Sequence, residues 1–221
     1  MASPSRPGPA APARARRSDG EVTRARVLDA AIACILELGY YQASSNAIAR
    51  RAGVTWGTIQ HQFGTREGLL LEALNEGWRR MQDDLREATV TGATLEERLE
   101  SVLDLLARWY GAPQYLAHLQ ILLDLSSDPA TSEAARDAVL AHGRELTRAW
   151  RPLFAQAMGE AGGDRELVEY AFLALRGFLA ANTLSSGYTT AGEDQRFRRL
   201  LVRGVALAIA ERAAQRGLSV G

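Results

Sequence analysis

Hydrogen-bonding side chains gather between residues 44 and 63, where the chain reads SSNAIARRAGVTWGTIQHQF. Hydroxyl, amide, imidazole and guanidinium groups can donate to phosphate oxygens, and glutamine can also bond bidentately to adenine. An indole such as that of Trp56 either packs against sugars and thymine methyl groups or lies on the domain surface. The chemistry that this segment favours is contact with duplex DNA. The candidate contact residues are Ser44, Ser45, Thr55, Trp56, Gly57, Thr58, Gln60, His61, Gln62 and Arg66.

Two short helices with a tight hinge are predicted to position these side chains. A serine at 44 or 45 can accept hydrogen bonds from the free amides of the first helix, and Gly53 tolerates the left-handed backbone that stops it. Thr55 can cap a second helix, on which Ile59 and Phe63 lie four residues apart and face inward. The polar side chains then lie largely outside. This pattern is typical of a helix-turn-helix, whose second helix enters the major groove of DNA.

Several segments in the same register resemble the N-terminal signature of TetR-family transcriptional repressors. The resemblance covers roughly residues 24 to 74 and does not reach the C-terminal two thirds. It departs from the family at Gln60, where the family usually has an aromatic residue, and at Arg66, where it usually has lysine. The matching segments are RVLDAA (26–31), GY (39–40), IA (48–49), AGV (52–54), GTIQHQF (57–63) and REGLL (66–70).

For the DNA complex we predict two kinds of contact. The side chains expected to face bases are those of Trp56, Gln60 and His61. A homodimer would hold two recognition helices about one DNA turn apart, roughly 34 to 36 Å, so that they read a palindromic operator. The residues expected to hold phosphate are Thr55, Gly57, Thr58 and Arg66.

Charge is distributed unevenly along the chain. The chain contains 26 basic residues, all of them arginine, and 26 acidic ones. Residues 1–66 hold nine arginines and four acids, for a net charge of +5, and the remainder carries −5. A basic N-terminal end suits DNA binding, because phosphate neutralisation supplies most nonspecific affinity. The alternative is a solvated charge imbalance with no partner.

Residues 1–19 are predicted to form a disordered arm rich in proline and arginine. Arg14, Arg16 and Arg17 end this arm. These arginines either enter a minor groove that flanks the operator, or they belong to a solvated tail that makes no contact with DNA.

The sequence gives little support for catalysis. The three histidines, His61, His118 and His142, form no metal-ligand or nucleophile motif, and there is no phosphate-cradling glycine loop. We therefore predict that the protein is not an enzyme and uses no cofactor or metal. Cys34 falls on an apolar stripe and is expected to serve packing. No apolar run is long enough for a membrane span, so we predict no membrane partner and a cytoplasmic location.

Beyond residue 65, apolar periodicity predicts helices almost throughout. We expect an all-α fold of about nine helices. A three-helix DNA-binding domain at 20–66 is joined to a ligand-binding and dimerisation bundle at 67–221. The helices predicted in the bundle cover residues 65–87, 95–110, 115–125, 130–159 with a bend or break near Pro152, 167–184 and 193–216.

The last two helices carry apolar stripes that are candidates for a dimer face. In the resembled family, these helices pair with their symmetry mates as a four-helix bundle. The alternative is that the stripes only close the core of one protomer. The predicted interface residues are Val168, Phe172, Leu175, Leu179, Leu201, Val205, Ala208 and Ile209.

Aromatic and polar residues of the intervening helices are candidates for an effector pocket. An aromatic stripe can equally be ordinary core. Arg176, in a largely apolar helix, either meets an anionic effector or pairs with an acid such as Glu169 or Asp124, and the ion pair is the preferred interpretation. The candidate ligand-binding residues are Trp109, Tyr110, Tyr115, His118, Leu122, Trp150, Phe154, Phe172, Phe178 and Asn182.

Together these patterns predict a ligand-responsive transcriptional regulator. The expected mode is repression that ends when a small hydrophobic effector releases the protein from a palindromic operator. The expected partners are double-stranded DNA, a small-molecule effector and a second copy of the chain. The alternative function is a helical partner-binding module whose DNA face has decayed, and an enzyme is less favoured than either.

Overall fold

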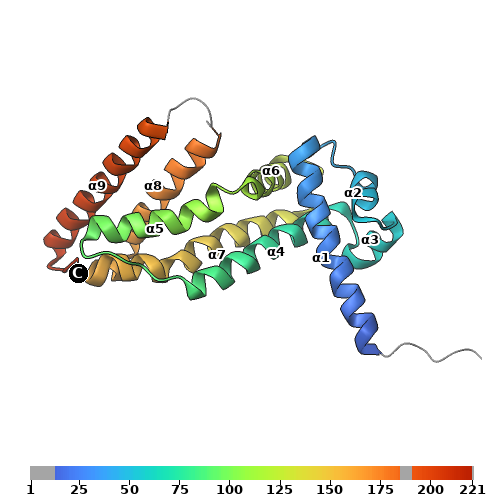
Figure 1. The fold of residues 1–221 in the computed structure, drawn as a ribbon, viewed down its shortest axis with the longest axis horizontal. Helices are drawn as coiled ribbons and strands as arrows, with labels where there is room; N and C mark the ends of the chain where they lie inside the picture. Colours follow the sequence, from blue (N-terminus) through green and yellow to red (C-terminus); the bar gives the residue numbers. More distant parts are fainter. Residues whose placement is uncertain (1–12, 185–190, 221) are drawn as a thin grey trace, which may run out of the picture. The chain divides into compact units, whose positions relative to one another are not determined.

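The computed structural model describes residues 13–184 and 191–220. Within these residues the chain forms nine α-helices, one short 3-10 helix and no strand (Figure 1), which confirms the all-helical prediction. The elements are α1 (Ala13–Leu38), α2 (Ser45–Ala52), α3 (Trp56–Phe63), α4 (Arg66–Glu87), α5 (Leu95–Tyr110), α6 (Pro113–Ser127), α7 (Glu133–Met158), η1 (Gly159–Gly163), α8 (Arg165–Leu184) and α9 (Ala191–Arg216).

The first helix begins earlier than the sequence analysis predicted. Its first residue is Ala13, so residues 13–19 lie in a helix and not in the predicted disordered arm. Alanine and arginine are good helix formers, and no proline follows Pro12 in this stretch, so the helical backbone can extend toward the N-terminus. Residues 1–12, which make up the rest of that arm, lie outside the described residues.

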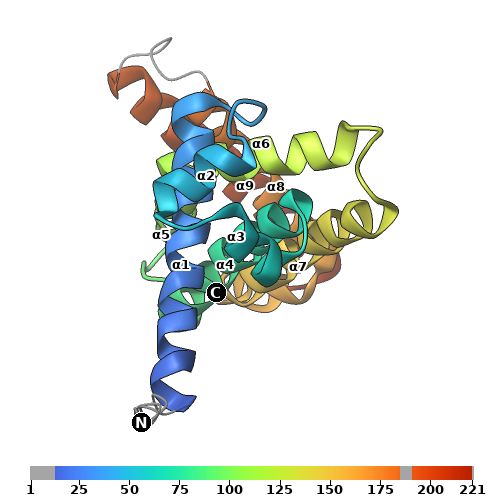
Figure 2. The same ribbon diagram turned by 90° about the vertical axis from the view of Figure 1, so that its right-hand side faces the viewer.

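The chain divides within α4 into two compact units, one ending at Ala73 and the other beginning at Leu74. In the N-terminal unit, α1 packs across α2, and α2 packs against α3 (Figure 2). Cys34 is buried on the inner face of α1, as predicted. The fully buried core of this unit comprises Val27, Ala31, Ile35, Ala43, Ile48, Ile59, Leu69 and Leu70.

The C-terminal unit is a helical bundle in which α5 packs against α7, α8 and α9. Trp150 and Phe154 of α7 and Phe172 of α8 are its largest fully buried side chains. α7 continues through Pro152 without a break, so the predicted division of this helix is not observed.

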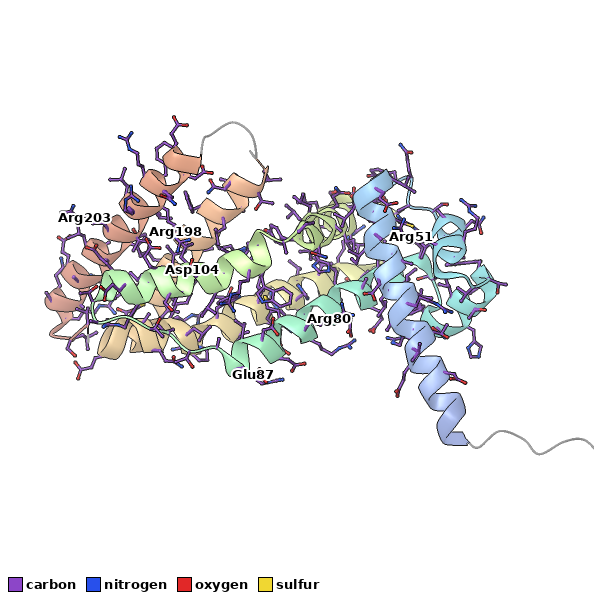
Figure 3. All side chains as sticks on the ribbon, in the orientation of Figure 1. Arg51, Arg80, Glu87, Asp104, Arg198 and Arg203 are labelled. Carbon is purple, nitrogen blue, oxygen red and sulfur yellow. The ribbon has the colours of Figure 1, made fainter. Side chains whose placement is uncertain are left out.

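Two arginines hold the ends of the bundle together. Arg98 donates to the carbonyl oxygens of Ala157 and Val220, at 2.7 Å each, so one side chain joins α5, α7 and the C-terminal segment. Arg198 of α9 donates to carboxylate oxygens of Glu100 at 2.5 Å and Asp104 at 2.7 Å, both on α5 (Figure 3). Hydrogen bonds between charged groups are among the stronger polar contacts, so these two residues fix how α5 packs.

Among the described helices, α8 alone is long and apolar enough to cross a membrane by length and composition. A third of its most apolar window is buried inside the protein. Phe172 and Leu175 are part of that buried fraction, and packing against α5 and α7 accounts for their hydrophobic character.

Candidate nucleic-acid interface and effector site

Local hydrogen bonds build the helix-turn-helix. The Ser44 hydroxyl accepts from the Ala47 amide at 3.2 Å and starts α2, and the Thr55 hydroxyl accepts from the Thr58 amide at 3.2 Å and starts α3. Gly53 ends α2 in the left-handed conformation, with a φ of 64°. Each of these bonds spans only three residues, so the hinge is determined by the local sequence.

The face of α3 that the sequence analysis predicted to contact DNA is accessible. Gln60 and His61 are exposed, and Trp56 is partly buried. Ile59 is fully buried and anchors the helix to its unit. Side chains that face bases must be free of internal contacts, and Gln60 and His61 meet that requirement best.

Other predicted contact residues have part of their hydrogen-bonding capacity used internally. The hydroxyls of Thr55 and Thr58 lie 3.0 Å apart and share a hydrogen bond. Gln62 is partly buried, and its Oε1 atom is enclosed without a hydrogen-bond partner. Gln62 is therefore turned in part toward the protein.

Arg66 is engaged within the N-terminal unit. Its guanidinium donates to the carbonyl oxygens of Tyr40 at 2.6 Å and Ala43 at 3.4 Å, and it lies 4.4 Å from the centroid of the Tyr40 ring. These contacts join the start of α4 to the loop that precedes α2. Arg66 therefore positions the start of α4 against the loop before α2. The phosphate contact predicted for Arg66 stays a prediction.

Two further arginines of this unit are also paired internally. Arg24 forms an ion pair with Glu72 and lies over the Phe63 ring, and Arg51 donates twice to the Glu37 carboxylate, at 2.5 and 2.6 Å (Figure 3). Bidentate arginine pairs are geometrically specific and hold side chains in place. The positive charge counted in the sequence is therefore only partly available to a partner.

Arg50 is a functional candidate that the sequence analysis missed. It lies in the last turn of α2, is exposed, and forms no ion pair among the described residues. The sequence places Arg50 and Arg51 side by side, and nothing in their order indicates which one pairs with Glu37. Only the helix orientation separates the free guanidinium from the paired one.

The predicted dimer interface stays a prediction, but most of its residues belong to the core of one chain. Six of its eight residues have side chains buried within one protomer, and Leu201 and Ala208 are partly buried. Side chains with so little exposed surface can contribute only little area to a contact with a second chain. Helices α8 and α9 are apolar on more than one side, and periodicity alone did not identify the stripe that closes the core. The six buried residues are Val168, Phe172, Leu175, Leu179, Val205 and Ile209.

Both helices carry a second apolar stripe that is exposed. On α8 it includes Leu173, which is 56% exposed, and on α9 it includes Leu200, which is 67% exposed. Each stripe also contains an exposed glycine, Gly177 and Gly204, where an added Cβ would meet no atom of the protomer. The full set of large exposed apolar residues on these two helices is Tyr170, Leu173, Leu184, Phe197, Leu200 and Leu207.

The structure brings five of the predicted ligand-binding residues together in the C-terminal unit. The ring centroids of Tyr110 and Tyr115 lie 4.9 Å apart, those of Tyr110 and Trp150 lie 6.5 Å apart, and those of Phe154 and Phe172 lie 6.1 Å apart. Trp109 and Phe178 pack against the same core from partly buried positions. Leu122 and Asn182 are partly buried.

His118 occupies a different place. Its imidazole packs against α4 at Gly77, where an added Cβ would clash with the ring. Burial lowers the pKa of His118 to about 4, and the nearby His142 and Arg80 act in the same direction. The imidazole is therefore neutral near pH 7 and serves the packing of α6 on α4.

Arg176 makes neither of the predicted ion pairs. Its guanidinium lies 5.5 Å from the centroid of the Tyr110 ring and 5.8 Å from that of Phe172, and no carboxylate of the described residues pairs with it. Glu169 lies instead near Arg165, at 3.9 Å. Burial raises the pKa of the Tyr110 hydroxyl further above neutral pH, where a tyrosine is already protonated.

An open groove of about 910 Å³ lies elsewhere in this unit, between α5 and α9. Glu100 and Asp104 line one wall, and Arg199 and Arg203 line the other (Figure 3). None of the predicted ligand-binding residues lines it. Its charged walls suit solvent better than a hydrophobic effector. No group of three or more potential metal ligands occurs in the part of the chain that the structure describes.

Comparison with known proteins finds relatives of the N-terminal part of the chain. Residues 27–73 match the family model described as bacterial regulatory proteins, tetR family. The fatty acid metabolism regulator protein of Bacillus subtilis is 35% identical over 82 residues, which cover 35% of this chain and 40% of the relative. The regulator BetI of Escherichia coli is 32% identical over 85 residues, 38% of this chain and 44% of the relative. The chain thus matches less than half the length of these relatives.

Solved structures share the fold over most of the chain. A TetR-family transcriptional regulator from Streptomyces coelicolor has a TM-score of 0.63 at 21% identity, covering 85% of this chain and 95% of that one. The multidrug binding protein EbrR complexed with ethidium has a TM-score of 0.61 at 19% identity, covering 82% and 96%. FadR from Bacillus subtilis, in complex with stearoyl-CoA, has a TM-score of 0.55 at 20% identity, covering 83% and 96%. At these identities the likeness concerns the fold.

Proposed function

We propose that this chain is a DNA-binding transcriptional regulator controlled by a small molecule, because residues 27–73 match the family model of bacterial regulatory proteins of the tetR family. The observation that carries the proposal is the exposed polar face of α3, with Gln60 and His61 free on a helix capped at Thr55. A short, rigid helix with free hydrogen-bonding groups suits the major groove. Arg50, and Arg66 to the extent that its internal bonds allow, would contact phosphate.

The proposed regulator acts as a homodimer. One recognition helix contacts too few base pairs for useful specificity, and a two-fold dimer reads a palindromic operator. The exposed apolar stripes of α8 and α9 support this assembly, because large apolar patches on a protein surface mark interaction sites. Gly177 and Gly204 would let the partner helices approach closely.

Repression is the proposed mode, with the C-terminal unit as the effector-binding part. α4 joins the two units as one continuous helix, so a displacement of its C-terminal half reaches the helix-turn-helix. Ligand binding would then change the spacing of the two recognition helices, with a coupling free energy of about 1 to 3 kcal/mol. Two structural neighbours bind ethidium and stearoyl-CoA, and they support an effector with a large apolar part.

A DNA-binding measurement tests the proposal. The purified chain is titrated by fluorescence anisotropy against its own upstream intergenic DNA and against sites selected from a random library. We expect salt-dependent binding in the nanomolar range. Gln60→Ala should weaken binding to the selected site about 10-fold, because one bidentate base contact is worth about 1 to 3 kcal/mol.

The matched control is Gln114→Ala, since Gln114 is also exposed but lies on α6. It should leave the affinity for DNA unchanged. Absence of any sequence preference in the wild-type chain would reject the regulator and favour the partner-binding module. Equal effects of the two substitutions would reject α3 as the reading helix.

A further inference from the structure

Two buried polar atoms of the C-terminal unit lack hydrogen-bond partners in the same place. They are the hydroxyl of Tyr110 and the indole Nε1 of Trp150. Burial raises the pKa of the phenol and the indole lies close enough to lower it in part, but the two groups do not meet in hydrogen-bonding geometry. Tyr110 is 2% exposed and Trp150 is fully buried. Leaving such a group unpaired away from water destabilises a protein, so most native structures avoid it. Two in neighbouring rings need a physical explanation.

Arg176 adds a third donor to this place. Its guanidinium lies above the Tyr110 ring, at 5.5 Å from the centroid, and no carboxylate among the described residues neutralises it. Arg176 is only partly buried, as is Tyr115, whose ring contacts that of Tyr110 edge-on. The three donors therefore lie near one another, with the charged one at the solvent side. We call Tyr110, Trp150 and Arg176 the donor cluster.

The donor cluster is rich in donors. An indole N–H and a guanidinium can only donate, and a protonated phenol donates its single hydrogen and can also accept one. The positive charge of Arg176 has no counterion in the part of the chain described. The complementary group is an acceptor with negative charge and more than one oxygen. One guanidinium balances the single charge of a carboxylate, whereas a phosphate monoester would bring a second, unbalanced charge.

We propose that the donor cluster binds the carboxylate of an organic acid whose apolar body packs against the surrounding aromatic rings. The inference rests on the proposed function, because the acid would be the effector of the regulator. Phe154 and Phe172 lie beside the cluster and provide apolar contacts. The ligand would approach from the side of Arg176 and Tyr115, which are the accessible members of the group.

Matched pairs of acids and amides test the inference. Decanoate, phenylacetate and indole-3-acetate are each compared with the corresponding amide, by calorimetry with the full-length protein. The amide keeps the apolar body and the size but loses the charge. We expect at least one acid to bind the wild type about 10- to 100-fold more tightly than its amide, as charged hydrogen bonds are stronger than neutral ones. The same acid should release the selected DNA site.

Arg176→Met keeps the length and apolar stem of the side chain and removes the charge. It should abolish the preference for the acid and leave the weaker affinity for the amide. Arg165→Met is the control on the same helix, since Arg165 is strongly exposed. It should change neither affinity. Tyr110→Phe should weaken acid binding without loss of folding, because it removes a hydroxyl that has no partner in the protein.

The outcomes separate this inference from the proposed function. If no acid binds the wild type more tightly than its amide, or if Arg176→Met keeps the preference, the carboxylate site is wrong. DNA binding measured in the same preparations reports on the regulator alone. A wild-type protein that binds DNA but shows no acid preference retains its proposed function and loses only the effector class. A protein that prefers the acid but does not bind DNA loses the function and retains the site.

Discussion

The helix-turn-helix and the donor cluster differ in how far their polar side chains are exposed and in whether these side chains have hydrogen-bond partners. In the helix-turn-helix, most polar side chains face outward, and the hydroxyls of Ser44 and Thr55 accept hydrogen bonds from amides three residues away. In the donor cluster, Tyr110 and Trp150 are buried, come from different helices, and lack partners. In the first region, Gln62 Oε1 is the one enclosed side-chain polar atom without a partner among the described residues. The second is held in an energetically incomplete state by the bundle around it.

This difference indicates where a ligand can change the stability of the molecule. A ligand that binds only the native state stabilises a protein by an amount that grows with its affinity. A ligand that satisfies buried donors therefore has more to contribute than one that contacts exposed side chains. The helix-turn-helix is suited to present a fixed surface, and the donor cluster is suited to respond.

The largest expected effect is the loss of stability of the N-terminal unit when Arg66, at the start of α4, is replaced. Arg66→Ala removes two hydrogen bonds to backbone carbonyls and the contact with the Tyr40 ring. We expect the N-terminal unit to lose about 2 to 3 kcal/mol of its free energy of unfolding, because bonds from charged donors are the stronger kind. Trp56 is the only tryptophan before residue 74, and its fluorescence during urea unfolding reports on this unit.

Gln60→Ala is the comparison for this experiment. It should lower DNA affinity and leave the unfolding free energy unchanged, since Gln60 is exposed. If Arg66→Ala weakened DNA binding while the Trp56 transition stayed at the wild-type urea concentration, Arg66 would be a direct phosphate contact. In that case the helix-turn-helix would not depend on Arg66 for its geometry.

The contrast between the two regions also explains how far the sequence could predict them. Caps, the Gly53 hinge and the inward face of α3 depend on neighbours three or four residues apart, and these predictions are confirmed. Which apolar stripe of α8 is left exposed depends on the side of α8 that meets α5, and this is decided by residues far away in sequence. Leu175 and Leu173 are both leucines on the same helix, and only packing separates the buried one from the exposed one.

Ion pairs also depend on how the helices pack, and not on the sequence pattern alone. The sequence supplied Arg176 and two acids that could reach it, but the helix directions bring the guanidinium to aromatic rings instead. In the same way, Arg51 and not Arg50 meets Glu37. Long side chains have many partners within reach, so their pairing is fixed only when the helices are in place.

The second prediction concerns His118, a buried polar side chain of the C-terminal unit outside the donor cluster. It tests whether burial of this imidazole lowers the free energy of unfolding at acidic pH. His118 has a pKa of about 4 in the folded protein, below its ordinary value of 6.5. The unfolded chain therefore binds a proton more readily between these values, and stability falls as the pH falls through that range. Between pH 7.5 and 5 we expect a loss of about 2 kcal/mol. Urea unfolding followed by circular dichroism at both pH values measures it.

His118→Asn removes the titrating group and keeps a small polar side chain against Gly77. Its stability should change less between the two pH values than that of the wild type. Burial also lowers the pKa of His142, so a smaller slope of the same sign remains. If the free energy of unfolding of His118→Asn changed with pH as much as that of the wild type, the acid sensitivity would arise from other groups. Burial of His118 would then not lower the stability.

The smallest expected effect concerns Gly204, on the exposed stripe of α9. An alanine Cβ at this position would meet no atom of the protomer, so nothing within one chain requires glycine there. Replacing a helical glycine with alanine normally stabilises a protein by about 0.5 to 1 kcal/mol. If a partner helix packs closely on this stripe, the added methyl group would disturb the contact and cancel that gain.

Gly143 provides the matched control, since it lies inside α7, is exposed, and also has open space around a Cβ. Gly143→Ala should show the full stabilisation at every protein concentration. Gly204→Ala should show less, and sedimentation velocity should detect a weaker dimer, with Gly204→Leu as the stronger form of the same change. Equal gains at the two positions, with no change in assembly, would leave α9 a free surface. The exposed apolar stripes would then belong to a single chain, and the spacing of two recognition helices would need another source.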